Sequence, residues 1–527
     1  MGAKRRPTNA GDHLVDSIQL DRSGDKPLYL QLGEILRQQM ASGRLPVGAK
    51  LPATRELSDA LSVNRATVVE AYRWLRLQGW VRSGVGSGTY VTGRALGFGG
   101  DANLVQSRPG TGAGVLADAE GDGFWSSRIE ELPRPEAKSE TQAPAWTIRF
   151  TSPTADPDGF PIDEFRSVLE EVLDREGARS LDYGPPDGYG PLRELIAERL
   201  ARQSVRVDPS QVLLVNGSQQ GLDLVFRMLV PKGRTLILEE PTYHLALRTA
   251  RALRLPVAAV PLDAEGLRID RLERVLDETD AGMLYTMPVF QNPTGLNLSA
   301  ERRERLLSLS AERKLPVVED HFDAELDYRG DAPPPLLSHG SPQNVVLLGT
   351  FSKILFPGLR VGWMVVPEAL LGPFSEMKVC ADLSGGLLTQ MALDEFCRRG
   401  HLDAHLERVR ARNRRRLVAM LDALEAAMPR EARWTRPTGG MALWLWLPSG
   451  VDSEEVAEEA LRRGLALTPG TAFCPAGGGR DGLRLSFVRE SEERIREGTR
   501  LLADTIRDLG ARSGRSGRER AAAAPIL

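Results

Sequence analysis

Short apolar runs alternate with helical stretches from about residue 150 to residue 508, and this alternation constrains the fold most strongly. The runs are rich in β-branched or other apolar residues, which predicts strands. Strands that alternate with helices over hundreds of residues are typical of an α/β domain with a largely parallel sheet. The expected strands are Gln211–Val215, Thr235–Leu238, Met283–Thr286, Val317–Glu319 and Val345–Leu348.

The end of this region predicts a smaller lobe. A long arginine-rich helical pattern follows Cys397, and apolar runs come after it at Met441–Leu447 and Leu483–Val488. A helix followed by strands in this way indicates an α+β lobe. The last residues, 509–527, have low complexity and predict a disordered tail.

Residues 26–93 have a different pattern, in which short helices precede a hairpin. Apolar residues recur at helical spacing in three segments, the last of which ends at Gly79. Two apolar pairs, Trp80-Val81 and Tyr90-Val91, then flank a glycine-rich turn, as in a two-stranded wing. Residues 1–25 are an N-terminal arm. Residues 94–149 are rich in small, proline and acidic residues without a sustained period, and they predict a linker.

The charge of the chain is unevenly distributed. The whole chain has a net charge of −3, but residues 1–93 carry 13 basic and 8 acidic residues, a net of +5. The remainder has a net charge of −8. A basic first segment on an acidic body predicts that this end contacts a polyanion, although a solvated basic face would have the same charge.

Composition also excludes several classes of protein. No uninterrupted apolar stretch approaches the roughly 20 residues that span a bilayer, and the charged N-terminal residues lack the apolar core of a secretory signal. The three cysteines, Cys380, Cys397 and Cys474, lie in no CxxC spacing. This favours a reducing compartment and argues against a structural zinc site. We therefore expect a cytoplasmic protein with no metal and no membrane partner.

Lys353 is one of only eight lysines and stands in the loop Gly349–Trp363, directly after an apolar run. Thr350 and Ser352 precede it, and Arg360 follows seven residues later. A solvated surface lysine would account for this position. The alternative is a poorly solvated amine that loses its proton and attacks a carbonyl to form an imine. Hydroxyls and an arginine beside it would suit a phosphate on that carbonyl compound. Pyridoxal phosphate carries both an aldehyde and a phosphate.

Three other segments carry groups that suit such a compound. Asn216–Leu222 opens a helix, and its first N–H groups with the Ser218 hydroxyl form an anion site suited to a phosphate. Tyr243 lies just past an expected strand and offers an aromatic face on which a flat ring can stack. Asn292 lies in a turn from which its amide could reach a phenolic oxygen.

Two charged residues complete the set. Asp320 ends an expected strand, where a carboxylate could pair with a pyridinium nitrogen; Asp323 and Glu325 are nearby alternatives. Arg484 lies inside an alternating strand, where an arginine without a partner would be costly and an incoming carboxylate would pair with it.

The segment Leu51–Val91 resembles the GntR-type winged helix-turn-helix, and the resemblance covers essentially all of residues 26–92. Asn64 can cap the third helix, whose first-turn side chains would then face the major groove. Ser62 and Ala53 depart from the usual glycine and serine of this pattern. The resemblance implies an interface with double-stranded operator DNA at Arg55, Asn64, Arg65, Thr67 and the wing-tip residues Gly86 and Gly88.

Residues 150–508 resemble the class I aminotransferases, which depend on pyridoxal phosphate and have fold type I. The resemblance assigns Lys353 to the internal aldimine and Arg484 to a substrate carboxylate. Tyr183 matches a tyrosine that reaches the partner subunit's phosphate site, which implies a dimer. Phe322 replaces a frequent tyrosine, which puts a hydrogen bond to the ring oxygen in doubt. The other implied contacts are Ser218, Gln219, Thr350, Ser352 and Arg360 for the phosphate, Tyr243 for the ring face, Asn292 for the ring oxygen and Asp320 for the ring nitrogen.

A winged helix, a linker and an aminotransferase-like domain in this order resemble the MocR subfamily of bacterial transcription regulators. The resemblance implies a head-to-tail homodimer in which the aminotransferase-like domain is a sensor of pyridoxal phosphate or of a small amino compound. Members of this subfamily commonly control vitamin B6 or amino-compound metabolism, so we expect a PdxR-like or amino-acid-responsive role.

Two other functions compete with this hypothesis. A working aminotransferase with an appended DNA-binding module would use the same residues, because all the catalytic groups that it needs are present. A structural dimerisation protein would have to retain the lysine, the aspartate and the arginines by chance.

Overall fold

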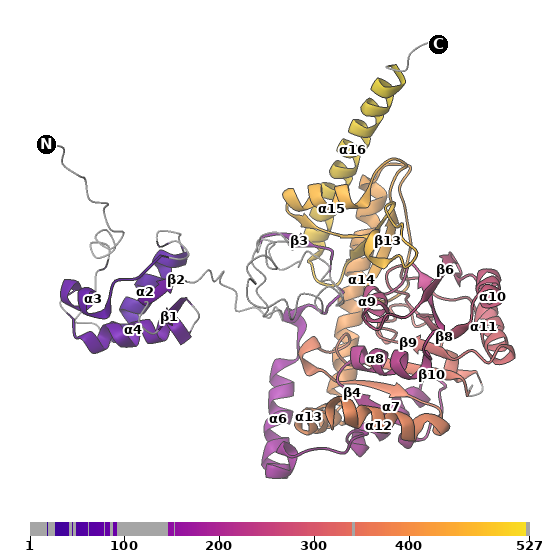
Figure 1. The fold of residues 1–527 in the computed structure, drawn as a ribbon, viewed down its shortest axis with the longest axis horizontal. Helices are drawn as coiled ribbons and strands as arrows, with labels where there is room; N and C mark the ends of the chain where they lie inside the picture. Colours follow the sequence, from indigo (N-terminus) through magenta and orange to yellow (C-terminus); the bar gives the residue numbers. More distant parts are fainter. Residues whose placement is uncertain are drawn as a thin grey trace, which may run out of the picture. The chain divides into compact units, whose positions relative to one another are not determined.

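The computed structural model describes residues 18, 27–41, 45, 49–61, 63–77, 80–84, 88–91, 146–151, 153–339 and 343–522. Contacts between residues divide the chain into two compact units, residues 1–110 and residues 111–527 (Figure 1). Each unit has its own hydrophobic core.

The first unit has the helices and the wing that the sequence predicts. Its buried core includes Leu32, Leu57, Val68 and Leu75, one or more from each helix. Two antiparallel strands follow the helices, with Val81 opposite Val91. The elements are α2 (Leu28–Ala41), α3 (Thr54–Leu61), α4 (Arg65–Leu77), β1 (Val81–Gly84) and β2 (Gly88–Val91).

Side chains cap the starts of α3 and α4. The Asn64 Oδ1 atom accepts a hydrogen bond from the Ala66 N–H at 2.9 Å, as the sequence predicts for the residue before α4. Before α3, the Ala53 N–H donates to Glu56 Oε2 at 3.1 Å. These bonds satisfy backbone donors that have no partner within their own helix.

An eight-stranded sheet forms the centre of the second unit. Its strand order is β4-β11-β10-β9-β8-β5-β6-β7, and its neighbours run parallel except where β11 or β7 is a partner. All five strands expected from the sequence are present, whereas β11 was not among them. The strands are β4 (Val212–Val215), β5 (Thr235–Glu240), β6 (Val257–Asp263), β7 (Gly266–Leu267), β8 (Ala281–Thr286), β9 (Val317–Asp320), β10 (Val345–Thr350) and β11 (Gly362–Val365).

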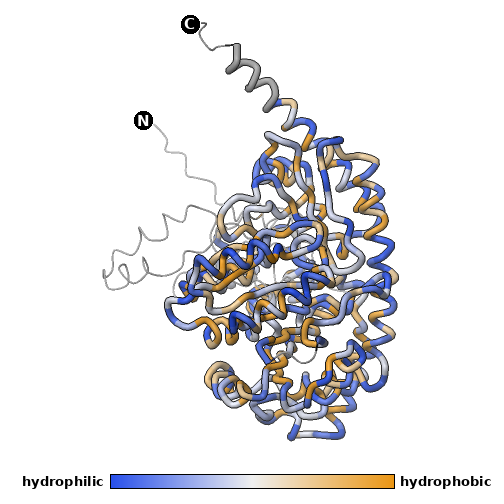
Figure 2. Tube along the Cα trace, turned by 90° about the vertical axis from the view of Figure 1, so that its right-hand side faces the viewer, coloured by the Kyte–Doolittle hydropathy of each residue, from blue (hydrophilic) through white to orange (hydrophobic). Residues whose placement is uncertain are grey.

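Helices connect these strands and pack against the sheet. Hydrophilic and hydrophobic segments alternate along the helices, as expected for helices with one face on the core (Figure 2). Helix α8 packs on β4, β10 and β11, and α12 packs on α8. The helices of this part are α6 (Ile162–Glu176), α7 (Gly190–Ala201), α8 (Ser218–Leu229), α9 (His244–Ala252), α10 (Ile269–Glu278), α11 (Ala300–Glu312), α12 (Leu371–Asp382) and α13 (Leu387–Arg398).

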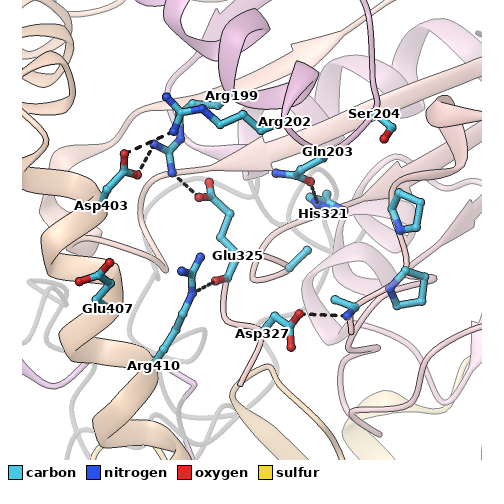
Figure 3. A pocket seen from close by; sticks show the side chains of 14 residues that line it. Arg199, Arg202, Gln203, Ser204, His321, Glu325, Asp327, Asp403, Glu407 and Arg410 are labelled. Carbon is cyan, nitrogen blue, oxygen red and sulfur yellow. Dashed lines mark hydrogen bonds and ion pairs between the residues drawn. The ribbon is translucent and has the colours of Figure 1, made fainter. Parts of the chain in front are cut away.

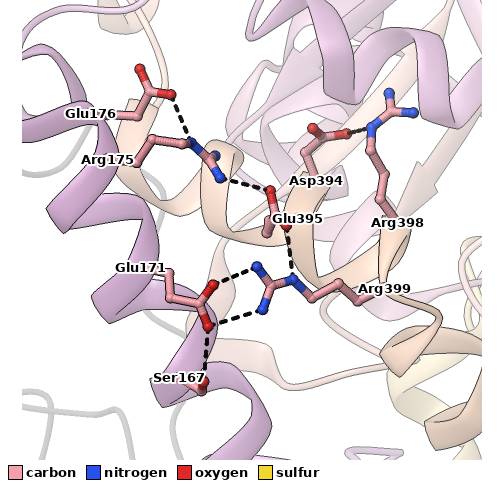
Figure 4. Close-up of polar contacts among 8 residues, drawn as sticks. All are labelled: Ser167, Glu171, Arg175, Glu176, Asp394, Glu395, Arg398 and Arg399. Atoms are coloured by element: carbon pink, nitrogen blue, oxygen red, sulfur yellow. Dashed lines mark hydrogen bonds and ion pairs between the residues drawn. The ribbon is translucent and has the colours of Figure 1, made fainter.

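Ion pairs join α6 to α13 at the surface (Figure 4). Arg175 lies 3.2 Å from Glu395, and Arg399 lies 2.6 Å from Glu171 and 2.8 Å from Glu395. Glu395 therefore lies between two arginines that reach it from different helices. Exposed pairs of this kind stabilise a fold by only about 0–1 kcal/mol each, so the helix contact depends mainly on its apolar residues.

The smaller lobe has the α+β composition that the sequence predicts. The long helices α14 and α16 pack against each other, and α15 packs on α16. A four-stranded antiparallel sheet has the order β12-β13-β16-β15, and β14 pairs with β3 in parallel. The elements are β3 (Ile148–Arg149), α14 (His401–Ala427), β12 (Arg433–Trp434), β13 (Ala442–Trp446), α15 (Ser453–Arg462), β14 (Leu465–Ala466), β15 (Thr468–Pro469), β16 (Gly482–Ser486) and α16 (Glu492–Ala522).

The tail expected to be disordered from residue 509 is instead helical as far as Ala522, as the end of α16. Low complexity was a poor guide here because the segment continues an existing helix. Adding a residue to a helix forms one backbone hydrogen bond without a new nucleation step, and alanine, arginine and glutamate have high helix propensity.

No helix in the described part of the chain is long and apolar enough to cross a membrane.

The cap of α4 leads to the first prediction. Replacing Asn64 with alanine should lower the unfolding free energy of residues 1–110 by about 1 kcal/mol, because the first turn of α4 loses an acceptor. Urea unfolding of this fragment, followed by circular dichroism, measures the change. Asn64→Asp keeps the acceptor and should stay close to the wild type; an equal loss in both variants would contradict the cap.

Candidate functional site

The predicted site residues of the second unit come together at one edge of the large sheet. Strands β4, β5, β8, β9 and β10 all run in the same direction. Ligands of open α/β sheets bind beyond the carboxyl ends of such strands. Five candidate residues lie at or just after these ends: Ser218, Tyr243, Asn292, Asp320 and Lys353.

Lys353 lies in the loop after β10 and is partly buried. Its Nζ atom donates a hydrogen bond to the Pro153 carbonyl oxygen at 3.2 Å. Burial, assisted by the positive charge of Arg484, lowers the pKa of Lys353 to about 8, while the carboxylate of Asp323 opposes the shift. A lysine with this pKa is neutral in a useful fraction of molecules near pH 7, and a neutral amine is the nucleophilic form.

Asp320 ends β9, which pairs with β10 so that Asp320 lies opposite Leu348. Its Oδ2 atom accepts a hydrogen bond from the Tyr285 hydroxyl at 2.7 Å. Its Oδ1 atom is buried and has no hydrogen-bond partner among the described residues. Burial raises the pKa of Asp320 to about 6. A cationic N–H donor would satisfy Oδ1 and favour the charged carboxylate, so the position fits a protonated ring nitrogen.

The structure separates Asp320 from one of its alternatives. Glu325 forms an ion pair with Arg199 at 2.5 Å and so already has a cationic partner. Asp323 is buried, and burial raises the pKa of its carboxyl well above the usual value. The charge of its carboxylate opposes the lowering of the Lys353 pKa.

The sequence did not single out Tyr285, although it holds the Asp320 carboxyl. It lies on β8, the strand next to β9. A tyrosine inside an apolar run was the available signal, but only the pairing of the strands shows what its hydroxyl contacts.

Two aromatic rings lie parallel at this edge. The rings of Tyr243 and Phe322 are within 5° of parallel, with centroids 6.5 Å apart. Both positions were noted in the sequence, Tyr243 as a ring face and Phe322 as the loss of a hydroxyl. The structure adds that Phe322 presents its own flat face toward Tyr243. Flat apolar surfaces in this arrangement suit stacking of an aromatic ligand.

The phosphate candidates surround the start of α8. Gly217 precedes this helix with φ +78°, and a side chain there would come within 2.6 Å of Arg360 Nη2. A side chain at Gly362 would come within 2.7 Å of the Ser218 nitrogen. Arg360 donates a hydrogen bond to the Asn216 carbonyl oxygen at 2.9 Å. Backbone N–H groups at a helix start and an arginine thus meet in a space that only glycines leave open.

The hydroxyls before Lys353 differ in their contacts. Thr350 Oγ1 accepts a hydrogen bond from the Ser352 N–H at 3.1 Å, whereas the buried Ser352 Oγ has no partner within the described chain. Gln219 donates through Nε2 to Thr249 Oγ1 at 2.8 Å, and its buried Oε1 atom has no hydrogen-bond partner in the part of the chain that the structure describes. An amide oxygen repels a phosphate, so we expect Gln219 to contribute its backbone N–H rather than its side chain.

Arg484 reaches the same site from β16 in the smaller lobe and is 3% exposed. Its Nη1 atom lies 3.4 Å from Asn292 Oδ1, and Nη2 donates to the Thr151 carbonyl oxygen. The guanidinium carbon lies 4.8 Å from the centroid of the Phe473 ring. The structure therefore brings together Asn292 and Arg484, which are far apart in the sequence.

Tyr183 is 79% exposed in the single chain. Its sequence-based role concerns a partner subunit, which a single chain does not test. In the first unit, Arg55 and Arg65 are exposed and Thr67 is partly buried. Gly86 lies outside the described residues.

A separate pocket of about 550 Å³ lies between α7, α14 and the segment after β9 (Figure 3). Neither Lys353 nor Arg484 lines it. Its charged groups pair with one another, since Arg199 contacts both Asp403 at 2.6 Å and Glu325. The pocket is therefore a different surface from the candidate site.

Two protein families match this chain. The family described as "Aminotransferase class I and II" matches residues 156–500. The chain belongs to this family. The family described as "Bacterial regulatory proteins, gntR family" matches residues 28–91, so the chain joins a gntR-family domain to an aminotransferase-family domain. This order is that of the MocR subfamily of regulators.

Individual relatives show the same division. Aromatic-amino-acid aminotransferase 1 of Thermococcus litoralis is 36% identical over 67% of this chain and 86% of its own length. The protein named "Uncharacterized HTH-type transcriptional regulator YdfD" of Bacillus subtilis is 28% identical, but over 92% of this chain and 98% of its own length. LysN of Thermus thermophilus, an alpha-aminoadipate aminotransferase solved in complex with N-(5'-phosphopyridoxyl)-L-leucine, is 36% identical. It covers 73% of this chain and 99% of its own, with a TM-score of 0.68. The regulator thus matches both parts of this chain, whereas LysN covers about three quarters of it.

The lowered pKa of Lys353 leads to the second prediction. Acylation of its Nζ atom by trace acetic anhydride should rise with pH and reach half its maximum near pH 8. Below that pH the amine is protonated and unreactive, whereas exposed lysines ordinarily titrate near 10.4. Peptide mass spectrometry of the cofactor-free full chain measures the acylation of Lys353 and of the exposed lysines in the same sample. A Lys353 profile that coincides with that of the exposed lysines would contradict the lowered pKa.

Proposed function

We propose that this aminotransferase-family regulator binds operator DNA through its gntR-family domain and senses pyridoxal phosphate, alone or with a small amino compound, in its second unit. The observation that carries the proposal is the match to the regulator YdfD over 92% of this chain and 98% of that protein. We propose that its target genes serve vitamin B6 or amino-compound metabolism and that it acts in the cytoplasm.

The residues around Lys353 fit pyridoxal phosphate. Asp320 Oδ1 and Ser352 Oγ have no hydrogen-bond partner among the described residues. The former suits a protonated ring nitrogen, and the latter suits a phosphate oxygen. When bound, pyridoxal phosphate supplies an aldehyde that condenses with primary amines and a ring that withdraws electrons.

We assign the following roles to this chain's own residues. Lys353 supplies the amine with which the aldehyde would condense. Its lowered pKa keeps this amine neutral in a fraction of the molecules. Asp320 accepts the ring N–H and holds the proton there, while Tyr285 orients the carboxylate. Tyr243 and Phe322 cover the ring faces, and Asn292 donates to the ring oxygen. The phosphate is bound by Ser218, the Gln219 N–H, Thr350, Ser352 and Arg360.

Arg484 is assigned to the carboxylate of an amino compound. Its guanidinium contacts oxygen atoms of Asn292 and Thr151 and the face of Phe473 at the edge where the other candidate residues lie. A guanidinium can form a bidentate pair with a carboxylate. This makes an amino acid or a similar amino compound the expected class of effector.

We further propose a head-to-tail homodimer, in which Tyr183 reaches the phosphate site of the partner subunit. Large apolar side chains that are exposed on one chain indicate a surface for another protein. Leu181 is 70% exposed, Tyr183 79% and Leu383 57%. The two segments lie next to each other, because a side chain at Gly184 would contact Leu387 at 3.4 Å.

Operator recognition is assigned to the start of α4 and to α3. The Asn64 cap holds the first turn of α4 in place, with Arg65 exposed on it. A recognition helix presents such first-turn side chains to base edges, and arginine is the usual partner of guanine. We assign Arg65 and Thr67 to the bases, Arg55 to the phosphate backbone and Gly86 to the wing contact.

A working aminotransferase is the second candidate, because every group that transamination requires is present at the site and named aminotransferases are among the relatives. The regulator and the aminotransferase differ in the measurable consequence of ligand binding. A regulator must show altered operator affinity, whereas an enzyme must release a keto acid at a useful rate.

The third prediction concerns recognition. Arg65→Ala should weaken operator binding by about 1–3 kcal/mol and relax base preference at one position in each half-site. Arg55→Ala should weaken binding to all sequences alike and reduce the salt slope by about one unit. Fluorescence anisotropy with operator and scrambled duplexes at several salt concentrations measures both effects. Arg73→Ala, an exposed arginine later on α4, is the matched control. Wild-type affinity for operator DNA in an Arg55/Arg65 double alanine variant would contradict the assignment of these arginines to DNA binding.

The fourth prediction tests sensing. Pyridoxal phosphate should change operator affinity by about 5- to 150-fold, and operator DNA should change affinity for pyridoxal phosphate by the same factor. Lys353→Ala should fold and dimerise but lose most of this response. Any keto-acid formation should be slow beside the roughly 10 per second of ordinary enzymes. Unchanged operator affinity together with rapid turnover of one amino acid would establish the enzyme instead.

A further inference from the structure

A buried lysine on α12 has no part in the roles assigned above. Lys378 is 1% exposed, and its Nζ atom lies 2.9 Å from Asp382 Oδ1, one helical turn later. Burying an ammonium is costly unless a carboxylate pairs with it. The buried ion pair therefore needs a structural or functional explanation. The contacts of the second carboxylate oxygen of Asp382 provide one.

Asp382 Oδ2 holds two residues at the start of α8. It accepts hydrogen bonds from Asn216 Nδ2 at 2.7 Å and from Gln220 Nε2 at 2.9 Å. Gln220 in turn accepts the Asn216 N–H at 2.8 Å through its Oε1 atom. Asn216 is thereby held by its backbone N–H and by its side chain.

The backbone carbonyl of Asn216 connects this cluster to the phosphate candidates. Its carbonyl oxygen accepts the 2.9 Å hydrogen bond from Arg360 Nη2. Asn216 also directly precedes Gly217 and the first N–H groups of α8. A continuous chain of contacts therefore runs from Lys378 through Asp382 and Asn216 to Arg360.

We propose that Asp382, held by Lys378, is a positioning residue for the phosphate-binding turn Asn216–Ser218 and for Arg360. This inference rests on the proposed binding of pyridoxal phosphate and goes beyond it, because neither Lys378 nor Asp382 is among the residues assigned above to contact the cofactor. Asp382 fixes Asn216 in the orientation in which its carbonyl holds the Arg360 guanidinium over the start of α8. Without Asp382, the turn and the arginine lose their fixed relation and bind a phosphate less tightly.

The test compares two probes that differ only in the phosphate. Cofactor-free full-length protein is titrated with pyridoxal phosphate and with pyridoxal, and bound ligand is followed by absorbance. The variant Lys378→Met/Asp382→Leu removes both charges at once and so leaves no unpaired buried charge. We expect its preference for pyridoxal phosphate over pyridoxal to fall about tenfold or more, as for a lost hydrogen bond to a charged group. Its affinity for pyridoxal should stay within about twofold of the wild type.

Two further variants keep the result interpretable. Arg227→Met/Asp223→Leu removes an exposed ion pair on α8 that has the same four-residue spacing and a distance of 2.7 Å. This variant should leave the preference for pyridoxal phosphate over pyridoxal unchanged. Asp382→Asn retains one acceptor and should have a smaller effect in the same direction; it serves alone if the double variant does not fold.

An unchanged preference in the Asp382 variants would overturn the positioning role. Equal losses for both probes would overturn it as well, because general loosening of the fold does not discriminate the phosphate. If the wild type bound neither probe, the proposed cofactor would be wrong instead.

Discussion

The parallel pairing of β9 with β10 determines where the two central groups of the candidate site, Asp320 and Lys353, lie relative to each other. Asp320 lies opposite Leu348 in this pairing, so the carboxylate and the loop that carries Lys353 emerge at the same edge of the sheet. Side chains alternate between the faces of a strand, and a slip of one residue would exchange Asp320 for Glu319 or His321. Both neighbours are buried and titratable, and in the observed register it is Asp320 that accepts the hydrogen bond from the Tyr285 hydroxyl. The register of two strands thus selects which of three consecutive polar residues faces the site.

Burying polar groups at the carboxyl edge of the large sheet costs free energy unless each polar atom has a hydrogen-bond partner. Oxygen atoms of Asp320 and Ser352 are buried without partners in the described chain, and burial shifts the pKa values of Lys353 and Asp320 toward their neutral forms. Most buried polar groups in folded proteins have a hydrogen-bond partner, and a bound ligand is one way to supply it. Cationic and acceptor groups held in advance reduce the reorganisation that binding requires.

Regulation requires that such binding favour one arrangement of the protein over another, because a ligand shifts an equilibrium only through differential affinity. The contacts around α12 suggest where that difference can arise. Asp382 ends the helix and accepts a hydrogen bond from Asn216 in the turn Asn216–Ser218, and the next residue, Leu383, exposes an apolar side chain. A subunit that packs on this surface would act on a helix end already linked to the site.

Local signals in the sequence determined much of this protein. The alternation of apolar runs predicted the five strands, Asn64 predicted a cap, and the polar residues that follow the strands marked the edge of the sheet at which the candidate site residues lie. These features depend on neighbours within one element, so they can be read along the chain. Low complexity after residue 508 misled because it ignores the helix from which the segment continues.

Only the tertiary structure decided which groups touch. Tyr285 meets Asp320, Phe322 lies parallel to Tyr243, Arg484 reaches Asn292, and Asp382 holds Asn216. Each contact joins separate elements, and its geometry depends on strand order, register and helix packing together. Burial, which lowers the pKa of Lys353, likewise comes from the whole of the surrounding fold rather than from its own segment.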